Sequence, residues 1–68
     1  MRLIDIITLI TDNSNVIITD LNNKELARYD GKNSIPKKYN KKEVVEISTY
    51  QEGKKAVLRI QIKVLVLG

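Results

Sequence analysis

The chain has 68 residues and a net charge of +4, and it contains no Cys, His, Trp or Phe. This length gives room for a single domain over residues 1–68, with a small core of Ile, Leu and Val. The absence of Cys and His excludes a disulfide framework and removes the commonest metal ligands and general bases. The eight carboxylates form no recognisable catalytic motif, so we expect neither an enzyme nor a bound cofactor or metal.

The first element is expected to be an amphipathic helix. Its apolar residues follow the helical spacing i, i+3, i+4 and i+7, and they are Leu3, Ile6, Ile7 and Ile10. Asp5 would lie in the first turn, where a carboxylate favours the helix dipole. The high isoleucine content is typical of strands, so a strand over residues 2–10 stays open as the alternative.

A β-hairpin is expected next. The segments Val16–Thr19 and Glu25–Tyr29 have the composition of short strands. Between them, Asp20–Lys24 is rich in Asn, which tolerates a positive φ and favours a tight turn. The two strands should therefore pair antiparallel.

A short helical turn should follow the hairpin. Ser34 is a suitable N-cap, and Pro36 suits an early helical position. We therefore expect a short α- or 3₁₀-helix over Pro36–Asn40, from which Ile35 and Tyr39 reach the core.

A second hairpin completes the chain. Its first strand is expected at Glu43–Tyr50, and its turn at Gln51–Lys54, where Gly53 is free to take a positive φ. In the last strand, alternate positions form the longest apolar row of the chain, which is Ala56, Leu58, Ile60, Ile62, Val64 and Val66. We expect this row to face the core, and the strand to be either central in the sheet or completed by another subunit.

The order helix, hairpin, short helical turn, hairpin predicts an α+β fold. In this fold the N-terminal helix packs on a small, mostly antiparallel sheet of about four strands.

Basic residues concentrate in the second half of the chain. Residues 32–68 carry nine basic and three acidic side chains, whereas residues 1–31 carry three basic and five acidic ones. The candidate residues for binding a partner or nucleic acid are Lys32, Lys37, Lys38, Tyr39, Lys41 and Lys42, and Lys54, Lys55, Arg59 and Lys63 would extend this patch. Lysines can neutralise phosphates, and a tyrosine can stack on a base.

The alternative for this stretch is a solvated loop, or a loop that contacts an acidic protein. The stretch lacks Arg, which binds phosphate best, and Tyr39 also suits a role as a core anchor. Nucleic acid is therefore possible as a ligand but is not favoured.

Two further features of the sequence are candidate sites. The far end of the last strand is apolar on both faces, so Val64, Leu65, Val66 and Leu67 are candidates for self-association into a homodimer. The alternative is that other parts of the chain cover them. Three acidic residues near the first hairpin either share a hard cation or act as turn formers, and the second role is favoured; they are Asp12, Asp20 and Asp30.

The whole chain resembles the small accessory proteins of phages and prophages of low-GC Gram-positive bacteria. The likeness lies in the opening helix at Leu3–Ile7, the hairpin at Val16–Leu26, the Ile-Pro-x-x-Tyr turn at Ile35–Tyr39 and the strand at Glu43–Ile47. The resemblance implies a mobile-element protein that binds one host protein, for example a nuclease complex of the anti-phage or CRISPR type. It carries no functional residue over to this chain.

These observations lead to one expectation with two alternatives. We expect a non-enzymatic protein-interaction module that binds a host protein or protein–nucleic acid complex and blocks it. Because no apolar run reaches the roughly 20 residues of a membrane span and no signal peptide is evident, it should act in the cytoplasm, of the host cell if phage-encoded. The alternatives are a small nucleic-acid-binding protein that uses the Lys32–Lys42 loop, and a structural subunit that pairs through its C-terminal strand.

Overall fold

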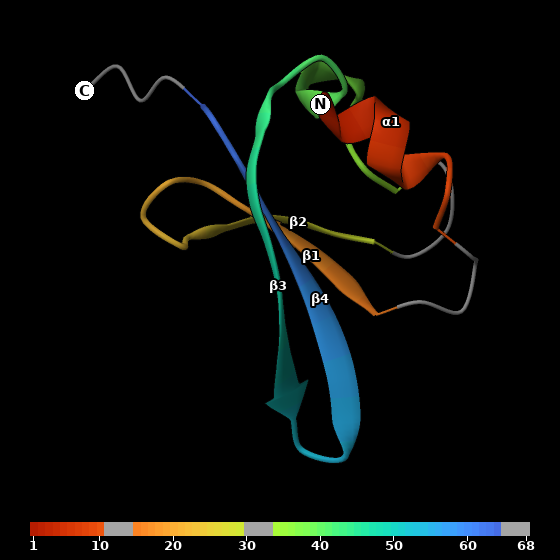
Figure 1. Ribbon diagram of the computed structural model, residues 1–68, viewed down its shortest axis with the longest axis vertical. Helices are drawn as coiled ribbons and strands as arrows, with labels where there is room; N and C mark the ends of the chain where they lie inside the picture. Colours follow the sequence, from red (N-terminus) through yellow and green to blue (C-terminus); the bar gives the residue numbers. More distant parts are fainter. Residues whose placement is uncertain (11–14, 30–33, 65–68) are drawn as a thin grey trace.

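The computed structural model describes residues 1–10, 15–29 and 34–64. A four-stranded sheet dominates the fold, with a short helix at one end (Figure 1). The elements in chain order are α1 (Leu3–Ile7), β1 (Val16–Thr19), β2 (Glu25–Tyr29), the 3₁₀-helix η1 (Lys37–Tyr39), β3 (Val44–Glu52) and β4 (Lys55–Ile62). The fold is α+β, as expected, and both predicted hairpins are present.

The sheet is mixed, with the strand order β2-β1-β4-β3. Each hairpin is antiparallel, whereas β1 and β4 at the centre run parallel. The sequence did not predict this parallel pair. Parallel neighbours need a long connection, which β2, η1 and β3 supply here. The arrangement places the two strands that contribute most to the core side by side.

Helix α1 is shorter than the apolar stripe suggested. It ends at Ile7, although Ile10 still packs against the core. At its start, the backbone N–H of Arg2 donates to the Asp5 carboxylate at 3.1 Å. Five residues are too few for a helix to be stable alone, so packing must hold it in place.

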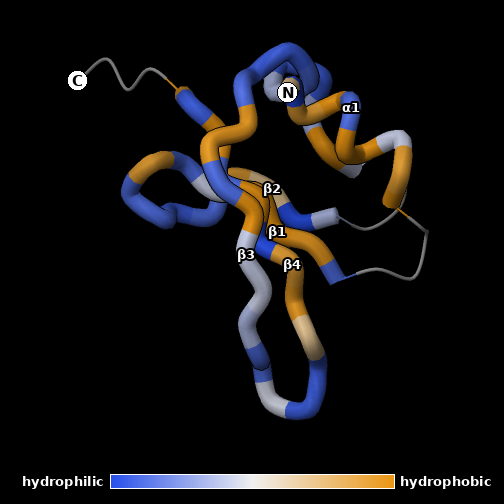
Figure 2. Tube along the Cα trace, in the orientation of Figure 1, coloured by the Kyte–Doolittle hydropathy of each residue, from blue (hydrophilic) through white to orange (hydrophobic). Residues whose placement is uncertain are grey.

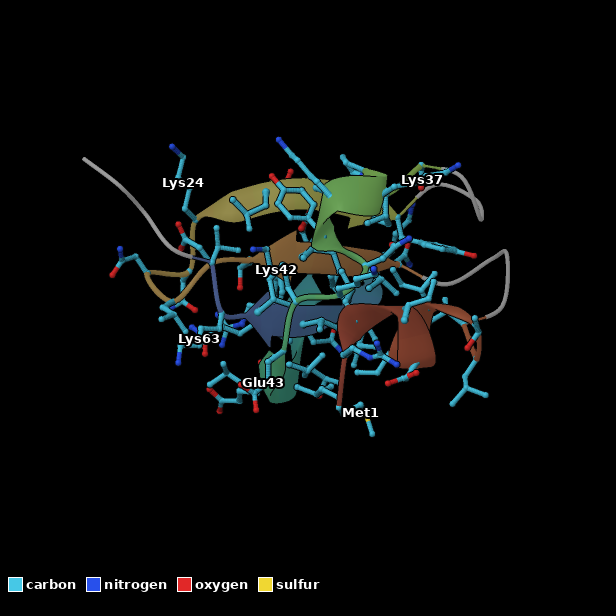
Figure 3. All side chains as sticks on the ribbon, turned by 90° about the horizontal axis from the view of Figure 1, so that it is seen from above. Met1, Lys24, Lys37, Lys42, Glu43 and Lys63 are labelled. Atoms are coloured by element: carbon cyan, nitrogen blue, oxygen red, sulfur yellow. The ribbon has the colours of Figure 1, made fainter. Side chains whose placement is uncertain are left out.

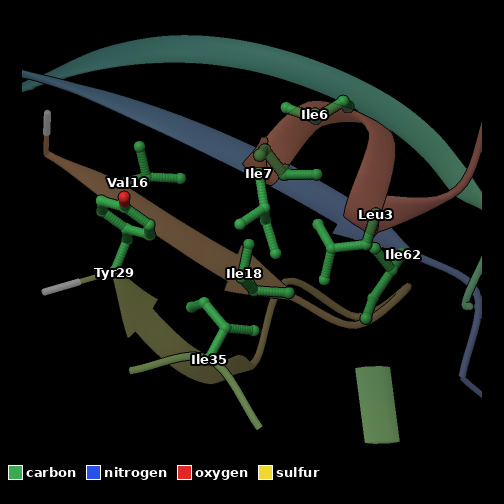
Figure 4. Close-up of a cluster of buried hydrophobic side chains, with 9 residues drawn as sticks. Leu3, Ile6, Ile7, Val16, Ile18, Tyr29, Ile35 and Ile62 are labelled. Atoms are coloured by element: carbon green, nitrogen blue, oxygen red, sulfur yellow. The ribbon is translucent and has the colours of Figure 1, made fainter. Parts of the chain in front are cut away.

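The core lies between one face of the sheet, α1 and the segment before η1 (Figure 4). Its buried residues come from α1, β1, β2, β4 and the segment before η1. They are Leu3, Ile6, Ile7, Val16, Ile18, Tyr29, Ile35, Ile60 and Ile62. The aliphatic composition expected from the sequence is therefore confirmed, with Tyr29 as the one fully buried ring of the described core.

The apolar row of β4 is buried at one end only. Ile60 and Ile62 are fully buried, and Leu58 and Val64 pack against the core. The prediction was wrong for Ala56, which is exposed because the β3–β4 hairpin extends away from α1 beyond the core (Figure 1). The hydropathy changes in the same way along β4: the tip of the β3–β4 hairpin is polar, whereas the part of β4 nearer α1 is hydrophobic (Figure 2). Val66 lies outside the described residues.

Both hairpin turns use a residue with positive φ, as expected. Asn23 has φ 65° in the first hairpin, and Gly53 has φ 64° in the second. In the first turn, Asp20 Oδ1 accepts hydrogen bonds from the backbone N–H groups of Asn22, at 2.8 Å, and Lys24, at 2.9 Å. This Asp is a turn former, which was the favoured interpretation.

The segment before β3 contains the expected helical turn but not the expected cap. Pro36, rather than Ser34, occupies the N-cap position of η1. Its ψ of 134° is extended, so Pro36 precedes the helical turn instead of beginning it. Ile35 is buried as predicted, and Tyr39 packs against the core while remaining partly exposed.

Candidate functional site

The basic loop is held firmly against the helix end of the molecule. The backbone N–H of Leu3 donates to Lys42 O at 2.9 Å, and that of Ile4 donates to Asn40 O at 3.0 Å. Among the predicted site residues, Lys37, Lys38 and Lys41 are exposed and Lys42 is partly buried, whereas Lys32 lies outside the described residues. The structure therefore presents at least three of these lysines to solvent.

Tyr39 is poorly placed to stack on a base. Its ring packs against the core, and the Lys38 ammonium lies 5.1 Å from the ring centroid, within range of a cation–π contact. The ring thus serves as the core anchor that the sequence allowed as an alternative.

The other lysines do not extend the basic loop into one patch. Lys54 and Lys55 lie at the tip of the β3–β4 hairpin, far from η1 (Figure 1). Viewed along the long axis of the molecule, Lys24, Lys37 and Lys63 lie at separate places on its outline (Figure 3). The basic charge of the described residues is therefore spread out rather than gathered at one site.

Arg59 and Arg28 are engaged within the sheet. Arg59 Nε donates to Ser48 Oγ at 3.1 Å. Arg28 Nη2 lies 2.9 Å from Glu25 Oε1, and this hydrogen bond, together with the charge of Glu25, raises the pKa of Arg28. The same nitrogen lies 3.9 Å from Glu52 Oε2. Because Arg28 is on β2 and Glu52 on β3, this contact shows that the twisted sheet brings its two edge strands near each other across one face.

The predicted metal and self-association residues are only partly described. In residues 1–10, 15–29 and 34–64, no three metal-binding side chains gather; Asp12 and Asp30 lie outside these ranges. Val64 is partly buried against the core, whereas Leu65, Val66 and Leu67 are not described. No helix in the described part of the chain is both long and apolar enough to span a membrane.

The outer edge of β3 is a candidate site that the sequence reasoning missed. β3 is the longest strand and forms one edge of the sheet. Its residues are exposed or only partly buried, and its large apolar side chains include Val45, 53% exposed, and Ile47, 48% exposed. A long edge strand with exposed apolar side chains is a template for the addition of another strand. The alternating sequence was a signal for a half-buried strand, but nothing local to it indicated an edge position.

The chain already uses the first part of this edge. The N-terminal segment pairs antiparallel with the start of the strand, through a bridge between Arg2 and Glu43. Two backbone hydrogen bonds frame the bridge: Val44 N–H donates to Met1 O at 2.8 Å, and Leu3 N–H donates to Lys42 O at 2.9 Å. The N-terminal segment then turns away as α1.

Beyond this contact the edge is open. A β-bulge falls between Val44 and Glu46, so Val45 is the extra residue at the point where the N-terminal segment leaves. From Val45 to Glu52, no described strand pairs with the outer side of β3. Within the described part of the chain, eight edge residues, 45–52, are therefore accessible to a partner.

Comparisons with known proteins do not identify this arrangement. No protein family matches the chain. No curated protein and no solved structure matches it either.

Proposed function

We propose that this chain is a non-enzymatic protein-binding module that takes up an extended segment of a partner along the outer edge of β3. The observation that carries the proposal is the bridge between Arg2 and Glu43, since the same edge already accepts one antiparallel segment. Following the resemblance to phage accessory proteins, the partner that we propose is a host protein, such as a subunit of a defence nuclease complex.

Strand addition suits this edge for a physical reason. An added strand satisfies unpaired backbone groups of Val45–Glu52 and covers part of the exposed apolar side chains Val45 and Ile47. Backbone hydrogen bonds give affinity to any extended segment, and the side chains of the edge select among segments. The binding should leave the core unchanged, because the edge residues contribute little to it.

The test selects peptides that bind the chain and then maps where they bind. A library of ten-residue peptides is selected on the chain, and amide hydrogen exchange is measured with and without each selected peptide. Free edge amides of β3 exchange quickly, so binding should slow those between Val45 and Glu52 by at least roughly tenfold, while the amides of the exposed loop at Lys37 and Lys38 stay unchanged. Selection of no peptide, or protection that falls only outside β3, contradicts the proposal.

The basic loop supports a second candidate function, the binding of a nucleic acid backbone. Its support is the exposure of Lys37, Lys38 and Lys41 within one short segment. Affinity for a random oligonucleotide should then fall steeply with salt, with a slope of roughly −0.7 per phosphate contact on single strands. Binding that survives high salt, or that is unaffected by changing all three lysines to Gln, contradicts it.

A further inference from the structure

We infer that the segment bound by β3 is basic: an extended peptide in which Lys or Arg alternates with apolar residues. This inference rests on the proposed function, because it names the chemistry of the partner at the same edge. It runs against the overall charge of the chain, which is +4.

The charge on β3 is opposite in sign to that of the whole chain. Residues 43–52 carry three glutamates, Glu43, Glu46 and Glu52, and no Lys or Arg. Within the described residues, Glu46 makes no ion pair, whereas Glu52 lies 3.9 Å from Arg28. Glu46, near the start of the accessible edge, therefore has no ion-pair partner among the described residues.

The alternation of the strand separates this charge from the apolar residues. Ile47 pairs with Ile60 of the core face, whereas Glu46 pairs with Gln61 and so points to the other face. A strand added beside β3 would place its own alternate residues on the same two faces. On one face it meets the exposed Ile47, and on the other it meets Glu46. The matching segment therefore alternates apolar and basic side chains.

A second copy of the chain fits this edge less well. Two copies paired through Val45–Glu52 would bring two glutamates from each, Glu46 and Glu52, into one two-stranded ribbon without a Lys or Arg from either strand. Like charges on neighbouring strands are destabilising. A nucleic acid is disfavoured here for the same reason, because its phosphates would face Glu46. The charge of the edge thus selects a basic segment of another protein.

The experiment compares three synthetic peptides of ten residues. In each peptide, every second position is Val or Thr, and the positions between them all hold one variable residue. This residue is Lys in the first peptide, Gln in the second and Glu in the third. Binding is measured by fluorescence anisotropy at low and high salt, and the bound site is mapped by hydrogen exchange of the β3 amides. We expect the Lys peptide to bind roughly three- to tenfold more tightly than the Gln peptide at low salt, since exposed ion pairs are individually weak. We expect the Glu peptide to bind least, and the difference to shrink at high salt.

Two matched variants locate the charge. Glu46→Gln should weaken the binding of the Lys peptide roughly two- to fivefold and leave the affinity for the Gln peptide unchanged. Glu46→Asp keeps the negative charge at the same position and should leave both affinities nearly unchanged. Glu46 is exposed, so both variants should fold.

The outcomes separate this inference from the proposed function. If all three peptides protect the β3 amides equally, or if Glu46→Gln has no effect, the basic partner is overturned but binding at the edge stands. If no peptide protects β3, and library selection also fails, both are overturned. If light scattering shows a dimer of the free chain that Glu46→Gln tightens and the peptides dissociate, then the occupant is a second copy, which also overturns the inference.

Discussion

Strands β1 and β3 have similar apolar content at their starts but opposite environments. β1 reads Val-Ile-Ile-Thr, and all four residues are buried. β3 begins Val-Val-Glu-Ile, and none of its nine residues is buried. The difference comes from position, because β1 lies between two strands while β3 forms an edge. In a sheet this small, the neighbours of a strand decide its burial more than its hydropathy does.

The largest expected effect contrasts one isoleucine from each strand. Ile18 of β1 is fully buried, so Ile18→Ala should lower the free energy of unfolding by about 2–5 kcal/mol. Ile47 of β3 is 48% exposed, and Ile47→Ala should cost about 1 kcal/mol or less. Urea unfolding followed by circular dichroism measures both.

If Ile18→Ala fails to fold, Ile18→Val provides the comparison, at about 0.5–1.5 kcal/mol. Equal costs at Ile18 and Ile47 would contradict the contrast, because they would mean that β3 is covered in solution. A dimer through β3 would produce that result.

The second effect concerns the turn that follows β1. Asp20 is 5% exposed, and its carboxylate accepts from the backbone N–H groups of Asn22 and Lys24. Asp20→Ala leaves both donors without this acceptor and should cost about 1–3 kcal/mol in thermal or urea unfolding. Asp20→Asn keeps an oxygen acceptor and should recover most of the loss. Equal destabilisation by both variants would show that the hydrogen bonds are not the cause.

The third effect concerns the turn that follows β3. Gly53 has φ 64°, and a Cβ added there would meet no atom within 4 Å. The cost of Gly53→Ala is therefore conformational alone, at about 1–2 kcal/mol for the left-handed backbone. Gly53→Asn should cost less, because Asn tolerates this region, as Asn23 does in the other hairpin. Equal stability of the Ala and Asn variants, measured by urea unfolding, would contradict this reason.

The local pattern of the sequence predicted both hairpins, although β3 runs to Glu52, two residues beyond the predicted end at Tyr50. Val16–Thr19 and Glu25–Tyr29 form strands with the predicted bounds, because the turn between them requires a residue such as Asn23 and the flanking residues favour strands. Ile35 and the helical stripe of α1 were also predicted to reach the core, and they do. These are features in which residues near in sequence decide the structure.

The arrangement of the hairpins was not accessible from such patterns. The parallel pairing of β1 with β4 joins residues about forty positions apart, such as Ile18 and Ile60, and no turn between them fixes the register. For the same reason the sequence did not indicate that β3 is an edge or that Ala56 is exposed. The candidate site was missed because it depends on the strand order, whereas the lysines that were predicted stand out by composition alone.

The smallest expected effect concerns one threonine on each of the contrasted strands. The Thr19 hydroxyl of β1 is buried, and it has no hydrogen-bond partner among the described residues. Thr49 of β3 is exposed, so its hydroxyl can bond to water. Burying a hydroxyl without a partner is unfavourable, so Thr19→Val should raise the free energy of unfolding by up to about 1 kcal/mol. Thr49→Val should change it by about 0.5 kcal/mol or less.

This pair gives the finest test of the contrast between β1 and β3, because Val replaces Thr at nearly constant volume in both strands. A cavity or a loss of packing therefore cannot explain a difference between the two variants. Destabilisation by Thr19→Val in urea unfolding would show that the hydroxyl is satisfied in solution, for example by a bound water, and that the end of β1 is less dry than its burial indicates.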